Sequence, residues 1–364
     1  MIRIFTGPAC LDHQAPPGYP ERPERLSGVL AHLRERGWPL AGDGGISPEA
    51  ARAAVTALHD EAYVARFERA ARRGDSLLDS ADNPLSGGTW EAAWAAVGAT
   101  LAAADWMAEE PGRTAFVAVR PPGHHAERST AMGFCFFNNA AVAAEHLRRR
   151  HGASRVAVFD FDVHHGNGTQ HLFEERADVF YASTHQYPFY PGTGAAGERG
   201  IGAGESFTLN VPLPAGTGDE RYGEVIREQV LPALRRFAPD VLVLSAGFDA
   251  WQHDPLGGMR VTEEGFRSWG DWLRDLAAEV CGGRVLALLE GGYDLRSLPR
   301  LVEAHLEGLA GGHRPSSPRP SSPVPSHPPS PGEEGAIQKQ KDAKGGGSPL
   351  PVREGGRGRE RGRG

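Results

Sequence analysis

Asp162, His164 and Asp249 are the residues of this sequence whose types and spacing first suggest chemistry. Asp162 and His164 stand two positions apart at the end of an apolar run, so a strand ending there would turn both to one face, which Asp160 shares. Asp249 follows a second apolar run. One imidazole and two carboxylates suit a divalent metal, and three protein ligands leave open positions for water and substrate, as in catalytic zinc sites. Taken singly, the Asp162–His164 motif is more often a solvated turn, and a lone aspartate such as Asp249 is usually a helix cap.

Candidate acid–base and oxyanion groups follow two further apolar runs. His124 and His125 come directly after a stiff Pro-Pro-Gly turn, and neutral imidazole is the natural general base near pH 7. Such a base needs a partner on its second ring nitrogen, for which Asp160 and Asn167 are candidates. Tyr293 follows Gly-Gly, and its hydroxyl could stabilise a developing oxyanion, although a tyrosine there is also a common turn aromatic.

Two aromatic residues stand beside turn residues instead of inside apolar runs. Phe134 follows Gly133, and Tyr190 precedes Pro191. Most aromatic side chains belong to the core. These two could instead line a narrow tunnel that leads to the candidate site.

The elements that position these residues alternate between two patterns. Short apolar runs predict strands, and longer helical patterns lie between them. The predicted strands are 2–5, 115–119, 155–161, 179–182, 207–211, 241–245 and 284–289, and the predicted helices are 22–36, 61–72, 89–107, 138–150, 220–237 and 263–280. This alternation predicts an α/β fold, with a mostly parallel sheet flanked by helices on both faces. Ligands of such sheets bind at the carboxyl ends of the strands, where the candidate residues fall.

Composition and charge exclude several classes of protein. The 364 residues are 40% hydrophobic and 23% charged, as in ordinary globular proteins. Three widely spaced cysteines form no disulfide framework and no CxxC zinc site, so we expect a reducing, cytoplasmic location. No run approaches the roughly 18 apolar residues of a membrane span. The net charge of −7 combines +5 in residues 314–364 with −12 in the rest, and an acidic body argues against nucleic acid and favours cationic ligands.

The last part of the chain has a different composition. Of its last 51 residues, 27 are Pro, Gly or Ser. Such a segment buries too little apolar surface to offset the entropy of ordering it. We therefore expect one catalytic domain over residues 1–312 and a disordered tail over residues 313–364.

Six motifs occur in the order found in the histone deacetylase family. They are Pro-Pro-Gly-His-His, Gly-Phe-Cys-Phe-Phe-Asn-Asn, Phe-Asp-Val-His-His-Gly-Asn-Gly-Thr-Gln, Tyr-Pro-Gly-Thr-Gly, Ser-Ala-Gly-Phe-Asp and Glu-Gly-Gly-Tyr. Essentially the whole of residues 1–310 resembles this family, which includes bacterial, class II-like histone deacetylases and acetylpolyamine amidohydrolases. The resemblance implies an arginase-like single domain and zinc-dependent hydrolysis of an amide.

The resemblance also implies a role for each matching residue. Asp162, His164 and Asp249 would bind one zinc ion, for which iron(II) could substitute; His124, His125, Tyr293, Asp160 and Asn167 would be catalytic; Gly133, Phe134, Tyr190, Leu256 and Asp82 would bind substrate; and Asp160, Asp162, His164, Ser183 and Thr184 would surround a structural potassium ion.

Two positions refine the expected subtype. Asn167 stands where class I enzymes have an aspartate and matches the class II pattern. Leu256 stands where the polyamine-selective enzyme has a glutamate, so we expect acetyl-lysine in proteins or peptides as the substrate, with an acetylpolyamine or another small acyl-amide as the alternative.

Two further hypotheses come from other classes. One is an arginase-like hydrolase with two metal ions, although Asp249 is followed by Ala250 and Trp251 and no carboxylate stands two positions on. The other is a non-catalytic protein that binds acyl ligands. The sequence leaves the physiological substrate and the oligomeric state open.

Overall fold

The computed structural model of the protein describes residues 1–312; the tail expected over 313–364 lies outside the described residues. Eight parallel strands form one sheet in the order β2-β1-β3-β8-β7-β4-β5-β6. They are β1 (Ile2–Phe5), β2 (Leu40–Ala41), β3 (Thr114–Val117), β4 (Val156–Asp160), β5 (Val179–Gln186), β6 (Thr208–Leu213), β7 (Val241–Ala246) and β8 (Val285–Leu289). The predicted α/β fold with a parallel sheet is confirmed.

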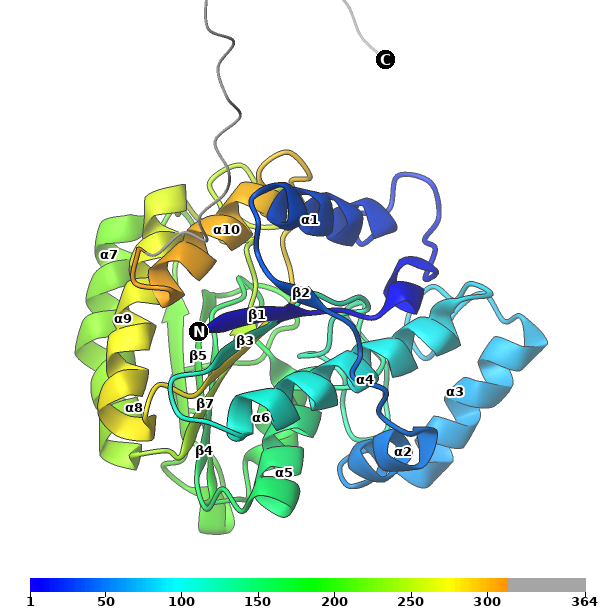
Figure 1. The fold of residues 1–364 in the computed structure, drawn as a ribbon, viewed down its shortest axis with the longest axis horizontal. Coiled ribbons are helices and arrows are strands. Elements are labelled where there is room, and N and C mark those ends of the chain that lie inside the picture. Colours follow the sequence, from blue (N-terminus) through cyan, green and yellow to red (C-terminus); the bar gives the residue numbers. More distant parts are fainter. Residues whose placement is uncertain (313–364) are drawn as a thin grey trace, which may run out of the picture. The chain divides into compact units, whose positions relative to one another are not determined.

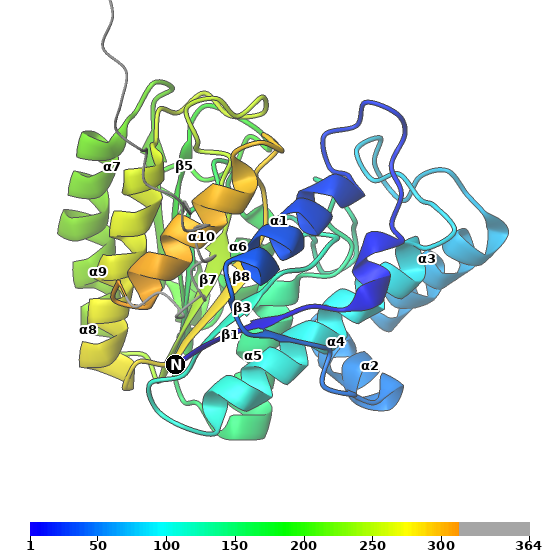
Figure 2. The ribbon, with the colours of Figure 1, turned by 45° about the horizontal axis from the view of Figure 1, so that its top comes forward.

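Helices cover both faces of this sheet (Figures 1 and 2). Helices α1, α9 and α10 pack on one face, whereas α4 and α5 lie on the other. The α-helices are α1 (Pro23–Glu35), α2 (Pro48–Thr56), α3 (Glu61–Arg73), α4 (Thr89–Ala108), α5 (Asn139–His151), α6 (Asn167–Phe173), α7 (Asp219–Val225), α8 (Leu231–Phe237), α9 (Glu263–Cys281) and α10 (Leu298–Leu309), and the shorter turns are η1 (Pro8–Leu11), η2 (Gly202–Gly204) and η3 (Ile226–Val230).

The central strands are buried on both faces because helices cover both. Every residue of β4, β7 and β8 is buried, which explains why their sequences are continuous apolar runs instead of alternating ones. Helix α4 contacts β1, β3 and β8 of the sheet and also helices α2, α3 and α5. Small alanine side chains allow that close approach all round the helix, and most of its residues are buried.

Several elements differ from the prediction. Strand β2 and helices α2, α6 and α10 were not predicted, and the single helix expected over 220–237 is α7 and α8 joined by a π-helical turn, η3. Thr262 caps α9, because its side chain accepts a hydrogen bond from the Gly265 amide. Gly88 precedes α4, and the hydroxyl of Thr89, the first residue of this helix, accepts a hydrogen bond from the Ser86 amide at 2.7 Å.

The strand order brings the candidate loops together. Strands β3, β8, β7, β4 and β5 are consecutive neighbours in the sheet, and all run in the same direction. The segments that carry the candidate residues therefore leave the sheet at one edge, as predicted. Within residues 1–312, no helix combines the length and the hydrophobicity needed to cross a membrane, and the three cysteines are buried and unpaired.

Candidate active site

The three predicted metal ligands meet just beyond the ends of β4 and β7. Their ligand atoms all lie within 4.8 Å of one another, and all three residues are buried. The Nδ1 atom of His164 is 3.0 Å from Oδ1 of Asp162 and 3.1 Å from Oδ2 of Asp249. Three side chains from the loops after β4 and β7 thus direct one nitrogen and two carboxylates at a single point.

Loop backbone, and not strand alternation, holds these ligands. Strand β4 ends at Asp160, so the predicted strand-end geometry for Asp162 and His164 was wrong in detail. The Val163 amide donates to Oδ1 of Asp249 at 2.8 Å, and the Gly291 amide donates to Oδ2 of Asp162 at 2.7 Å. A Cβ on Gly291 would lie 2.1 Å from Oδ2 of Asp249. Only glycine leaves room for this carboxylate.

The charges at this point fit a divalent cation. Burial raises the pKa of Asp249 to about 7. Burial alone would lower the pKa of His164, but its hydrogen bonds to the two aspartates raise it to about 10. Two fully buried carboxylates beside one imidazole are costly without a compensating positive charge. Two carboxylate oxygens and one imidazole nitrogen are also a donor set that zinc accepts.

The histidine pair lies beside the metal ligands with a different partner for each ring. Nδ1 of His124 is 3.0 Å from Oδ2 of Asp160, and Nδ1 of His125 is 2.7 Å from Oδ1 of Asn167. Burial opposes a charge on His124, but Asp160 and Asp162 raise its pKa to about 10. Burial and the neighbouring charges of His124 and His164 hold the pKa of His125 well below its usual 6.5. The pair therefore combines a charged imidazole with a neutral one.

A polar chain that the sequence did not reveal continues behind His125. Nδ2 of Asn167 donates to Oε1 of Glu127 at 2.5 Å, and the same oxygen is 2.7 Å from Nδ1 of His171. Asn167 is therefore oriented by a carboxylate, with its oxygen toward His125. The Glu127 side chain is 22% exposed and that of His171 is 39% exposed, so this chain links the buried imidazole to the surface.

A buried arginine, Arg25 of α1, contacts the Tyr293 ring and the backbone just before it. The guanidinium carbon of Arg25 lies 4.7 Å from the centre of the Tyr293 ring. Its Nε donates to the Gly292 carbonyl at 2.6 Å, and its Nη2 donates to the Glu290 carbonyl at 2.5 Å. Glu21 balances the arginine, accepting from Nη1 at 3.0 Å. Arg25 thus fixes the backbone on which the tyrosine stands.

Glu290 is a second buried group that joins the loops of the site. Its Oε2 accepts from the Gly123 amide at 2.7 Å and from the His124 amide at 3.2 Å. Burial raises the pKa of Glu290 to about 7. The loop after β8 therefore anchors the loop after β3, which carries the histidine pair.

A cavity of about 520 Å³ opens over these groups and contains the predicted tunnel residues. Among its lining residues are His125, His164, Tyr293, Gly133, Phe134, Phe189, Tyr190, Leu256 and Asp82. The Phe134 ring packs edge-on against that of Tyr293, with ring centres 5.9 Å apart, and the His164 ring stacks on Phe189 at 5.3 Å. Aromatic rings thus form walls close to the reactive groups.

Tight backbone geometry places Phe134 in this wall. Gly133 and Phe134 have φ of 57° and 70°, respectively. A Cβ on Gly133 would lie 2.2 Å from Cδ2 of His125, so this position needs glycine for both conformation and space. Asp82 supports the turn, accepting from the Gly133 amide at 3.1 Å and from the Tyr190 hydroxyl at 2.9 Å.

The residues expected around potassium lie on β4, on the loop after it and on β5. Asp160 ends β4, Asp162 and His164 follow in the loop, and Ser183 and Thr184 lie within β5. Asp160 is the register partner of Ser183, and Thr184 follows. The Thr184 hydroxyl is buried and has no hydrogen-bond partner among residues 1–312. A buried hydroxyl without a protein partner can be satisfied by a bound cation or an ordered water.

The site combines a buried centre of three metal ligands, a histidine pair for acid–base chemistry and a tyrosine, all at the inner part of an apolar cavity. This combination is that of a candidate metal-dependent hydrolase. The histone deacetylase domain matches residues 19–309. The chain therefore belongs to the histone deacetylase family, which is metal-dependent. The resemblance seen in the sequence is confirmed.

Three relatives illustrate the range of this family. The chain is 39% identical over 308 residues to the histone deacetylase-like amidohydrolase of Pseudomonas aeruginosa, covering 84% of this chain and 78% of that one. It is 42% identical over 267 residues to the chloroplastic histone deacetylase 14 of Arabidopsis thaliana, covering 71% of this chain and only 63% of the plant protein. The structure of an acetylpolyamine aminohydrolase from Burkholderia pseudomallei matches with a TM-score of 0.77 and 32% identity, covering 85% of this chain and 99% of that one.

Proposed function

We propose that this protein is a zinc-dependent deacetylase that hydrolyses the acetyl amide of N-acetyl-lysine in proteins or peptides. The observation that carries the proposal is the meeting of Asp162, His164 and Asp249 with His125 and Tyr293 beside one apolar cavity. An acetyl-lysine side chain presents four methylenes to apolar walls and an amide to the polar groups within.

Asp162, His164 and Asp249 would hold the zinc ion. When bound, zinc polarises the amide carbonyl and lowers the pKa of water, supplying hydroxide near neutral pH. The buried cluster offers three ligating side chains among residues 1–312, which supports one catalytic metal and disfavours the arginase-like hypothesis of two.

The protein groups would handle the protons. His125 is neutral and its Nδ1 faces Asn167, so its Nε2 is the atom that takes a proton from the attacking water. Once the C–O bond has formed, His125 returns this proton to the amine nitrogen as the C–N bond breaks, giving acetate and lysine. The Tyr293 hydroxyl donates to the carbonyl oxygen as it becomes an oxyanion. His124, whose charge is balanced by Asp160, gives electrostatic support.

The side chain of Leu256 favours acetyl-lysine over an acetylpolyamine as the substrate. Leu256 lines the cavity together with Gly257 and Gly258, and its aliphatic side chain offers no charge to a second ammonium group. The alternative, an acetylpolyamine substrate, is favoured by the similarity to the Burkholderia acetylpolyamine aminohydrolase and by the carboxylate of Asp82 in the cavity lining.

Acetate release from a substrate panel tests the proposal. Acetyl-lysine peptides, acetylspermidine and acetylputrescine are compared with wild-type protein, Tyr293→Phe and Leu256→Glu. We expect the peptides to be the best substrates, Tyr293→Phe to lose about 10²–10³-fold in kcat, and Leu256→Glu to shift preference toward the polyamines. A wild-type preference for polyamines would transfer the assignment to an acetylpolyamine hydrolase. Binding of an acetyl-lysine peptide without any turnover would favour the acyl-ligand binder.

Two further parts of the proposal rest on single features. A structural potassium ion beside Asp160, Asp162, His164, Ser183 and Thr184 is supported by the unpaired Thr184 hydroxyl. A reducing, cytoplasmic location is supported by the three unpaired cysteines.

A further inference from the structure

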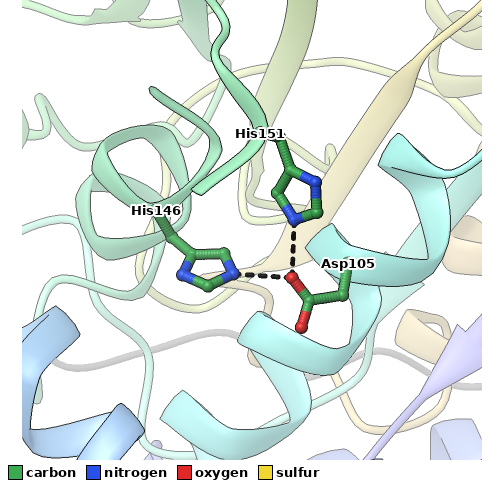
Figure 3. Close-up of side chains that lie close together, drawn as sticks. All are labelled: Asp105, His146 and His151. Atoms are coloured by element: carbon green, nitrogen blue, oxygen red, sulfur yellow. Dashed lines mark hydrogen bonds and ion pairs between the residues drawn. The ribbon is translucent and has the colours of Figure 1, made fainter. Parts of the chain in front are cut away.

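A second group of metal-ligating side chains lies away from the candidate active site, where α4 and α5 pack together. Asp105 of α4 faces His146 and His151 of α5 (Figure 3). Nε2 of His146 is 2.7 Å from Oδ1 of Asp105, and Nε2 of His151 is 2.6 Å from the same oxygen. The three ligand atoms lie within 4.8 Å of one another.

The fold places this group at the opposite edge of the sheet from the catalytic residues. Helix α4 ends at Ala108, shortly before β3 begins, and α5 ends at His151, shortly before β4 begins. The cluster therefore lies near the amino ends of these strands, whereas the candidate active site lies beyond their carboxyl ends. A ligand here would act on the packing of the two helices and not on the reaction.

The three side chains make more contacts than an ordinary ion pair needs. One histidine would be enough to pair with Asp105, and an exposed pair of this kind contributes only about 0–1 kcal/mol to stability. Here two imidazoles direct the same ring atom, Nε2, at one carboxylate oxygen. The side chains of His146, His151 and Asp105 are 17%, 26% and 39% exposed, so they are anchored in the helix packing yet leave room for water ligands.

The local field also favours a cation. Asp105 lies in the last turn of α4, and His151 is the last residue of α5. Both helices therefore direct their carboxyl ends, with partial negative charge, toward the cluster. Of the three arginines in the last turn of α5, Arg148 and Arg149 pair with Glu145, and Arg150 is exposed to solvent.

We propose that Asp105, His146 and His151 form a second metal site, which binds a divalent transition-metal cation of the zinc type and links α4 to α5. Two imidazole nitrogens and one carboxylate oxygen suit zinc and disfavour magnesium or calcium, which prefer all-oxygen sites. Three protein ligands leave at least one position for water. Together with the candidate active site, residues 1–312 would then hold two zinc ions.

Zinc binding to the untagged holoenzyme tests this site. Equilibrium dialysis at pH 7.5, followed by metal analysis, compares wild type with His146→Ala, His151→Ala and the isosteric Asp105→Asn. A matched control is His32→Ala, because His32 also pairs with a carboxylate on another helix, with Nε2 2.7 Å from Oε2 of Glu303. We expect two zinc equivalents in wild type and in the control, and about 100-fold weaker binding of the second equivalent in the three cluster variants.

A thermal shift gives an independent readout. Excess zinc should raise the Tm of the wild-type holoenzyme and of His32→Ala, because a ligand that binds only the folded state stabilises it, and it should leave the Tm of His146→Ala unchanged. Turnover of an acetyl-lysine peptide should be equal in wild type and His146→Ala. A wild-type chain that binds only one zinc ion, or cluster variants that keep the second ion at unchanged affinity, would overturn the proposal.

Discussion

Replacing Arg25 with methionine removes the guanidinium group that contacts Tyr293 and its backbone, while keeping most of the side-chain volume. The arginine donates to the carbonyls of Gly292 and Glu290 and to the carboxylate of Glu21. Each buried acceptor left without a donor costs about 1–3 kcal/mol, and breaking a buried ion pair costs about 3–5 kcal/mol. We expect the free energy of unfolding to fall by about 3–5 kcal/mol, which a stability of about 5–15 kcal/mol can absorb.

The catalytic effect of Arg25→Met should be separable from this loss of stability. Without the guanidinium 4.7 Å from its ring, Tyr293 is free to move, and a displacement of about 1 Å costs about 10²-fold in rate. We expect kcat to fall by about 10²-fold with KM almost unchanged, because only the transition-state contact is weakened. The kcat of Arg25→Lys should lie between those of the wild type and Arg25→Met, since one ammonium group cannot replace all the hydrogen bonds of the planar guanidinium group.

The assay measures kcat and KM for an acetyl-lysine peptide at a temperature where circular dichroism shows each variant to be folded. Arg120→Met is the matched control. Arg120 holds the same Glu21 carboxylate at 2.5 and 2.6 Å but donates to neither carbonyl before Tyr293. The Arg120→Met variant should lose stability but show a much smaller loss of kcat than Arg25→Met. The positioning role is refuted if folded Arg25→Met turns over at the wild-type rate, or if both variants lose kcat equally.

Three further predictions concern other parts of the site and the core. Gly133→Ala should lower kcat, because its Cβ would lie 2.2 Å from Cδ2 of His125. Gly18→Ala is the control and should not lower kcat, because Gly18 also has a positive φ but no atom stands within 4 Å of the added Cβ. Glu127→Gln should lower kcat about 10-fold, as supporting groups behind a functional histidine do; an unchanged kcat would contradict this. Burial lowers the pKa of His305 to about 4 from 6.5, so the unfolded state binds more protons between these values and stability falls as pH drops from 6.5 toward 4. Denaturant titrations at pH 7 and 5 should show a smaller fall for His305→Leu than for wild type.

The parts of the fold that were predictable are those with a strong local pattern. Strands β4, β7 and β8 are continuous apolar runs because both of their faces are covered. Strand β2 has only two residues, too few to show any period. Helix α6 has seven residues and depends on its surroundings, since a helix this short is marginal by itself.

The candidate site also contains some residues that the sequence predicts and others that it does not. Side chains with unusual chemistry, such as the His124–His125 pair, are visible in the sequence because few structural roles need them. The supporting groups are not visible, because their partners come from distant segments. Arg25 and Gly292 are 267 positions apart, and the Glu21–Arg25 spacing is that of an ordinary surface pair on a helix. Only the tertiary structure shows that both residues are buried.

The most direct test is metal-dependent acetate release from an acetyl-lysine peptide. The protein is treated with a chelator, dialysed and titrated with zinc, and Asp249→Asn is carried through the same steps. The proposed function predicts that chelation abolishes turnover, that zinc restores it in the wild type, and that Asp249→Asn stays at least about 10²-fold less active at the same zinc concentration. Full turnover by the chelated protein, or by Asp249→Asn, would contradict it.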